Sequence, residues 1–225
     1  MTYGGKGGHM SRVADEMDDL FDEEEGESLD VLLMAEDADI SDRVFACETL
    51  SGSFGHAEFE RCTFRQVSFA DTRWARASFD GCTFSSCDFT GAHMARSFLR
   101  DCRLSDCRFT GTDFHGSYIE RVSFRSCLLG YANLSESKAQ HVKFVSSALQ
   151  EASLDHMKTK SLAFEDADLT RAELFGTSLK GCDLSSSTID GIRISDTFAE
   201  LKGVSVSLDQ APLVLAILGV RVKEL

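Results

Sequence analysis

A five-residue period dominates the middle of this chain. Stepping by five from Phe54 reaches 29 positions, and 28 of them carry an apolar residue, the exception being Thr159. Twelve of the 17 phenylalanines lie at these positions, which run without interruption to Ile194. The residue two places before each position is nearly always small, and the other three positions of each five are mostly polar.

A period of five fits neither an α-helix, which repeats every 3.6 residues, nor a strand, which repeats every two. The large apolar residues share one interior only if the chain turns regularly every five residues, and such turns bury their side chains only by stacking. The period therefore predicts a solenoid with flat sides. We expect two ladders of its core to contain Phe64, Phe84 and Phe124 in one and Phe69, Phe89 and Phe109 in the other.

The cysteines indicate a second period, of twenty residues. All eight fall on the expected small inward position, in only two phases of this cycle, so one turn of the solenoid would have four five-residue faces. The first phase holds Cys62, Cys82, Cys102 and Cys182, and the second holds Cys47, Cys87, Cys107 and Cys127. These spacings match neither the close spacing of zinc ligands nor the short Cβ separation of a disulfide. We expect eight free thiols that pack as small buried residues.

Several five-residue units carry a more specific pattern of a small residue, a polar residue, and Leu or Phe. The units are Ala132-Asn133-Leu134, Ala167-Asp168-Leu169, Cys182-Asp183-Leu184 and Cys87-Asp88-Phe89. They resemble the signature of pentapeptide-repeat proteins, and the resemblance covers about Val44 to Asp196. It implies an all-β fold, a right-handed quadrilateral β-helix of about seven coils, with a short C-terminal helix.

Charge divides the chain into three regions. The net charge is −14, but residues 1–51 hold 15 acids and 3 bases, residues 52–196 hold 19 and 17, and residues 197–225 hold three of each. We expect an acidic, largely disordered tail over residues 1–43, with a possible short cap at 29–34. The β-helix would then occupy residues 44–196, and a C-terminal cap and dimerisation segment would occupy residues 197–225.

The acidic tail has two open interpretations. The run from Asp15 to Glu27 is rich in like charges that repel one another, which favours a solvated tail. The alternative is a short linear motif around Met17, Leu20 and Phe21. The first ten residues are Gly-rich and read as an expression leader, so they carry no weight in the fold prediction.

The C-terminal segment predicts a short apolar helix. Asp209 is the expected N-cap, Pro212 lies in the first turn, and Gly219 follows the last helical residue. A helix that is apolar all round must be buried on more than one side, so one side would cover the last coil and the other a second copy of the chain. The resemblance to topoisomerase-protecting family members also implies a dimer at this end. The expected dimerisation residues are Leu213, Val214, Leu215, Ile217 and Leu218.

Enzymatic function is not expected. No Ser-His-Asp order, paired acid set or phosphate-binding loop stands out, and the six histidines share no phase of the repeat. We therefore expect no cofactor, metal or small-molecule substrate. The acidic balance argues against direct nucleic-acid binding, and the lack of a transmembrane-length apolar run or signal peptide predicts a cytoplasmic protein without a membrane partner. Tyr118 and Tyr131 are outward aromatics that fit a contact surface.

The resemblance also suggests a function. The quinolone-resistance members of the family are dimeric rods that imitate duplex DNA and bind DNA gyrase, which implies a type II topoisomerase as partner and resistance to a fluoroquinolone or another antibiotic. The alternative is a scaffold that binds a different protein. The repeat region departs from a DNA mimic because its net charge is only −2. The candidate partner-binding acids lie in its C-terminal part: Glu165, Asp166, Asp168, Glu173, Asp183 and Asp190.

Overall fold

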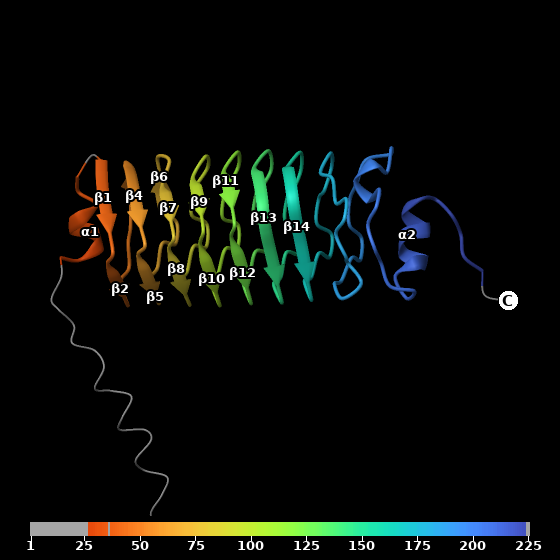
Figure 1. Cartoon of the computed structure of the whole chain (residues 1–225), viewed down its shortest axis with the longest axis horizontal. Coiled ribbons are helices and arrows are strands. Elements are labelled where there is room, and N and C mark those ends of the chain that lie inside the picture. Colours follow the sequence, from red (N-terminus) through yellow and green to blue (C-terminus); the bar gives the residue numbers. More distant parts are fainter. Residues whose placement is uncertain (1–26, 36, 224–225) are drawn as a thin grey trace, which may run out of the picture.

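A computed structural model describes residues 27–35 and 37–223, so most of the expected disordered tail lies outside the described residues. The described chain forms a straight rod of stacked coils with a short helix at each end (Figure 1). The predicted all-β solenoid is confirmed as a parallel β-helix. The short C-terminal helix is confirmed as well.

Left-handed corners create the five-residue period. From Arg61 to Gly191, nearly every fifth residue has a φ between 49° and 82°. Each corner follows a large inward residue by two positions, as Arg61 follows Phe59. This conformation turns the chain sharply, and it costs a non-glycine residue about 1–2 kcal/mol. The polar residues that occupy most corners therefore need the stacked coils to hold them in place.

Four faces follow from the register between coils. Partners on neighbouring coils are parallel and twenty residues apart, as in Phe64 opposite Phe84. We call the faces 1 to 4 after the columns that contain residues 58, 63, 68 and 73 in that order. Face 1 contains β1 (Asp37–Ser41), β4 (His56–Glu60), β7 (Ser78–Asp80), β9 (Phe98–Arg100) and β11 (Tyr118–Glu120).

The remaining faces follow in chain order. Face 2 contains β2 (Val44–Ala46), β5 (Thr63–Arg65), β8 (Thr83–Ser85), β10 (Arg103–Ser105) and β12 (Ser123–Arg125). The longer β13 (Lys138–Val145) and β14 (Lys158–Glu165) pass around the corner and belong to faces 1 and 2. Face 4 begins with β3 (Ser53–Phe54) and β6 (Arg73–Trp74). Face 3 is held by single bridges, such as Asp88 opposite Arg108.

Stacked phenylalanine rings fill the interior. The rings of Phe64 and Phe84 lie 4.7 Å apart between centroids and are 7° from parallel. Phe89 stacks on Phe69 at 4.5 Å and on Phe109 at 4.8 Å. Such aromatic pairs contribute about 0.5–1.5 kcal/mol each beyond the burial of their apolar surface. A shift of one coil by a single residue would break every one of these stacks, so the ladders hold the register.

Two of the inward columns also contain residues other than phenylalanine, namely Leu104 on face 2 and Thr159 on face 1. Leu104 lies between Phe84 and Phe124 in the register of face 2. Thr159, the one polar residue on the five-residue ladder, is half-buried and donates its hydroxyl to the carbonyl of Ser178 at 2.8 Å. The exception in the sequence pattern therefore has a hydrogen-bond partner on the next coil.

The first coil differs from the prediction in two ways. Its strands pair at a spacing of nineteen residues, as in Asp37 opposite His56, so the β-helix begins at Asp37 and the expected start at Val44 is wrong. The missing residue also shifts the repeat, and Cys47 lies at an exposed left-handed corner with a φ of 58°. Its expected inward position is therefore wrong, whereas the other seven cysteines are buried.

A short helix lies against the first coil. In α1 (Leu29–Leu32), Leu29 is buried with the core, and Leu33 directly after the helix is buried as well. The backbone N–H of Leu29 donates to the carboxylate of Glu48 at 2.8 Å. These contacts cover the apolar end of the rod.

The C-terminal end is attached through a glutamine. The spacing between partners widens to 22 residues at Asp183 opposite Ser205, after the 3₁₀ turn η1 (Ala199–Leu201). The helix α2 (Ala211–Ile217) follows Gln210, so the expected N-cap at Asp209 is wrong. The Gln210 amide donates to the carbonyls of Leu184 at 2.9 Å and Ser187 at 2.6 Å, which ties the start of α2 to the last coil.

The end of α2 agrees with the prediction. Gly219 follows the helix with a φ of 75°. The N–H of Gly219 donates to Ala216 and that of Val220 to Leu215, the two hydrogen bonds of a Schellman motif.

The exposure of Cys47 predicts the thiol reactivity of the folded protein. Burial raises the pKa of the Cys182 thiol to about 11, so that thiol stays protonated and unreactive at neutral pH. We expect a thiol reagent to modify Cys47 alone in the native protein and all eight cysteines in denaturant. Mass spectrometry of the labelled chain measures both numbers. Native labelling that survives in Cys47→Ser would contradict this assignment.

A second prediction concerns Ser97 in the small inward column. Its hydroxyl is buried and has no hydrogen-bond partner within the described part of the chain. A buried unsatisfied polar group costs about 1–3 kcal/mol, so Ser97→Ala should raise the midpoint of chemical unfolding. Ser117→Ala is the matched control, since the Ser117 hydroxyl donates to Met94 and accepts from the Ser97 N–H, and its loss should lower the midpoint. Equal losses in both variants would refute the prediction.

Candidate interaction surfaces

The candidate partner-binding acids lie around the rod rather than on one face. Asp168 lies on face 3, Glu165 and Asp166 lie at its corner with face 2, and Asp190 lies at its corner with face 4. We call these four residues the acidic patch. The register places Glu173 on face 4 and Asp183 on face 2, outside this patch.

Local contacts keep several of these acids ionised. Burial alone would raise the pKa of Asp168, but hydrogen bonds from Thr170 and Gln150 hold it below its ordinary value. Hydrogen bonds from Ser185 likewise lower the pKa of Asp183. Both carboxylates are therefore charged at neutral pH.

Nearby bases neutralise two of the candidate acids. Lys143 lies 3.6 Å from Glu165, and Arg193 forms a salt bridge with Glu173. Asp166 and Asp190 are exposed and form no salt bridge within residues 27–35 and 37–223. These two residues carry most of the unpaired negative charge of the acidic patch.

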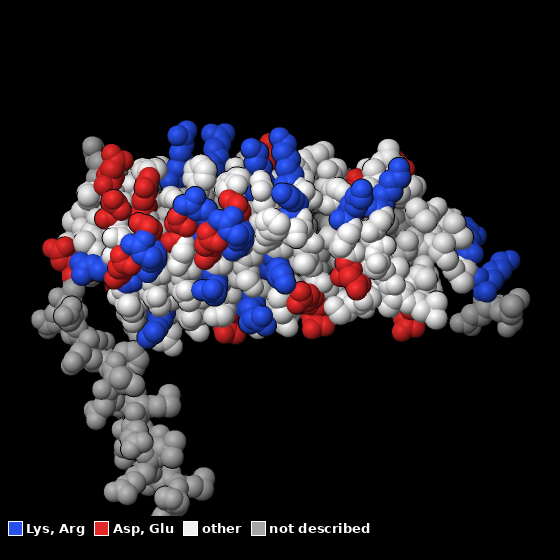
Figure 2. Space-filling view, in the orientation of Figure 1, with Lys and Arg blue, Asp and Glu red and all other residues white. Residues whose placement is uncertain are grey.

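The five expected dimerisation residues separate into two groups. Leu213, Val214 and Ile217 pack against the core and cover the last coil. Leu215 and Leu218 lie outside this contact, and Leu218 is 41% exposed. Three more exposed apolar residues lie near α2: Leu208, Val220 and Val222. The surface over α2 is largely uncharged (Figure 2).

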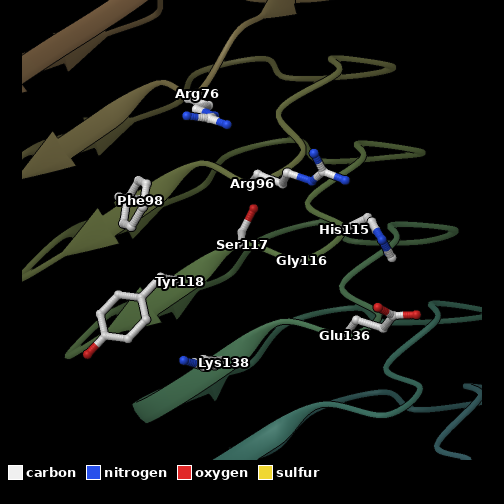
Figure 3. Close-up of a pocket in the computed structure, with 9 residues that line it drawn as sticks. All are labelled: Arg76, Arg96, Phe98, His115, Gly116, Ser117, Tyr118, Glu136 and Lys138. Atoms are coloured by element: carbon white, nitrogen blue, oxygen red, sulfur yellow. The ribbon is translucent and has the colours of Figure 1, made fainter.

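A groove that the sequence analysis did not identify lies at the corner of faces 4 and 1. Its volume is about 460 Å³. Figure 3 shows Phe98 and Tyr118 side by side at one edge, with Arg96 and His115 across from them. The residues that line it are Arg76, Arg96, Phe98, His115, Gly116, Ser117, Tyr118, Glu136 and Lys138.

The groove could have been predicted from the sequence by the twenty-residue spacing of its outward residues. Arg76 and Arg96 form one column, and Phe98, Tyr118 and Lys138 form the next. Tyr118 therefore belongs to the groove, whereas Tyr131 lies at the corner of faces 3 and 4 and does not join it.

Residues 27–35 and 37–223 contain no group of three or more His, Cys, Asp or Glu residues placed to hold a metal ion. Within the same residues, every helix is too short or too polar to cross a bilayer.

Comparisons with known protein families also identify the five-residue repeat in this chain. A family model of the pentapeptide repeat region matches residues 57–134, and a model of eight pentapeptide repeats matches residues 163–196. No curated protein matches the chain. Solved structures that are similar include HetL, a pentapeptide repeat protein involved in heterocyst differentiation regulation in the cyanobacterium Nostoc sp. strain PCC 7120, at 16% identity and a TM-score of 0.46, covering 74% of this chain and 86% of HetL.

A second similar structure is trypsin-treated QnrB1, a plasmid-mediated fluoroquinolone resistance protein. It is 19% identical with a TM-score of 0.38, and the match covers 82% of this chain and all of that one. The five-residue period, the four-faced coil and the two family matches together place this chain in the pentapeptide-repeat family.

Proposed function

We propose that this protein is a non-enzymatic interaction protein, a dimeric rod that presents its acidic patch to the DNA-binding surface of a type II topoisomerase such as DNA gyrase. The observation that carries the proposal is the unpaired charge of Asp166 and Asp190 near the end that carries α2. Carboxylates held on a rigid rod attract a basic groove that normally binds phosphates. Through this competition with DNA the protein would protect the enzyme from a fluoroquinolone or a related antibiotic.

Dimerisation would double the acidic patch. A two-fold contact through α2 joins two rods end to end, and each copy brings its own Asp166 and Asp190 toward the shared centre. The exposed side chain of Leu218 and the half-buried side chain of Leu215 supply apolar surface for this contact.

A scaffold for another protein is the second candidate function. Basic and acidic residues are intermixed on the face shown in Figure 2, and pairs such as Arg121 with Asp101 neutralise one another. A surface of mixed charge suits a partner with its own mixed charge better than it suits a DNA-binding groove.

The dimer is tested at α2. Neither Leu215 nor Leu218 packs against the core, so Leu215→Glu combined with Leu218→Glu should leave the rod folded and convert the dimer into a monomer. Light scattering after size exclusion at micromolar concentration measures the mass. Val31→Glu, at an exposed apolar position of α1 at the other end, is the control and should remain dimeric. A monomeric parent protein would contradict the dimer.

The partner is tested by DNA supercoiling with purified gyrase, with and without a fluoroquinolone. We expect the protein to inhibit supercoiling or to reduce drug-dependent DNA cleavage, and Asp166→Asn combined with Asp190→Asn should weaken the effect. Asp39→Asn combined with Asp106→Asn removes the same charge from exposed positions outside the patch and should change little. No effect of the parent protein on the enzyme in either assay would leave the scaffold function.

A further inference from the structure

The groove at the corner of faces 4 and 1 contains three cations without partners. Arg76, Arg96 and Lys138 are exposed and form no salt bridge within the described residues. On the neighbouring corner, in contrast, Arg100 is paired with Asp80 and Arg121 with Asp101. The chain thus neutralises the arginines of one corner and leaves those of the next available.

One acid lies among these cations, so the groove keeps an excess of positive charge. Glu136 is two rungs from Arg96 on the same column, and Gly116 lies between them. A side chain at Gly116 would meet Cγ of Arg96, 3.6 Å from its Cβ. Gly116 adds no side chain to the column between Arg96 and Glu136 (Figure 3).

An aromatic pair forms the other edge of the groove. Phe98 and Tyr118 are partners on β9 and β11, with ring centroids 6.3 Å apart. Phe98 is 50% exposed although it lies on a face whose other outward residues are mostly polar or charged. Tyr118 is half-buried, and its hydroxyl donates to Glu120 at 2.9 Å. Three cations beside one exposed and one half-buried ring fit an acidic peptide that carries an aromatic or aliphatic anchor.

We propose that this groove binds the acidic segment of the same chain, residues 15–25. That segment holds eight acids in eleven residues, and Met17, Leu20 and Phe21 are its apolar residues. Phe21 packs against Phe98 and Tyr118, and the neighbouring carboxylates pair with the groove cations.

The length of the chain allows this contact within one molecule. The described residues begin at Glu27, and α1, which starts at Leu29, lies against the first coil. The nearest part of the groove is about three coils along the rod, which is about 15 Å at the spacing of stacked strands. When extended, the six residues from Phe21 to Glu27 span up to about 20 Å and the twelve from Asp15 up to about 40 Å, so Phe21 can reach the near part of the groove and the acids before it can reach farther along the rod.

Binding of this segment changes the charge of the rod surface. The groove lies at the corner diagonally opposite that of Asp166. Pairing its cations with the carboxylates of residues 15–25 covers the basic side of the rod and leaves its excess charge negative. This inference does not depend on the identity of a partner protein.

Zero-length carbodiimide cross-linking of the full chain tests the proposal, since it joins a lysine amine only to a carboxylate in contact with it. We expect peptides from residues 15–25 linked to Lys138, and Lys143 linked to Glu165 serves as an internal positive control at 3.6 Å. Lys180 and Lys202, exposed near the other end, are the negative controls. Mixing chains of natural and heavy isotope composition separates links within one molecule from links between two.

Charge-reversal variants and high salt test whether the Lys138 cross-link depends on the cations of the groove. Arg76→Glu combined with Arg96→Glu should abolish the Lys138 link and spare the Lys143 link, whereas Arg103→Glu combined with Arg108→Glu on faces 2 and 3 should spare both. About 1 M salt shortens the Debye length to about 3 Å and should remove the Lys138 link as well. Links from residues 15–25 spread evenly over Lys138, Lys180 and Lys202, or no link to Lys138, would overturn the proposal.

Discussion

The left-handed corner at every fifth residue is the constraint on which the whole molecule depends. It is unfavourable for each non-glycine residue by itself, as at Arg61 and Asp101. Stacking offsets this cost because each coil adds a rung to the phenylalanine ladders and a row of backbone hydrogen bonds to its neighbour. A single coil therefore has no stability of its own, and the ends of the rod need the covers that α1 and α2 provide.

The same constraint separates stability from function. Two of every five side chains point inward and hold the register, while the outward positions are free to vary in charge and size. Columns of outward residues repeat every twenty residues, so a few substitutions in one phase create a surface feature along one corner. The basic groove arises in this way at the corner of faces 4 and 1, whereas the acidic patch spreads over face 3 and its two corners, on a rod whose repeat region is close to neutral overall.

The sequence period was sufficient to predict the fold but not its ends. An uninterrupted step of five from Phe54 defines the coils. The first coil is one residue shorter than the others, so the repeat pattern did not predict the start at Asp37 and wrongly predicted that Cys47 points inward. The N-cap at Asp209 failed because Gln210 is held by carbonyls of a distant coil, which local sequence rules do not register. Tyr118 was predicted to lie on a contact surface, but the groove itself was not, because its residues are far apart in the sequence and come together only in columns twenty residues apart.

We propose that the acidic patch of the rod competes with DNA for a basic protein surface. The most direct test is the affinity of the full-length protein for purified gyrase, measured over a series of salt concentrations in the presence and absence of duplex DNA. We expect the affinity to fall steeply as the salt concentration rises, and we expect duplex DNA to reduce it by direct competition. An affinity that is insensitive to salt, or simultaneous binding of the protein and DNA to the same enzyme surface, would contradict it.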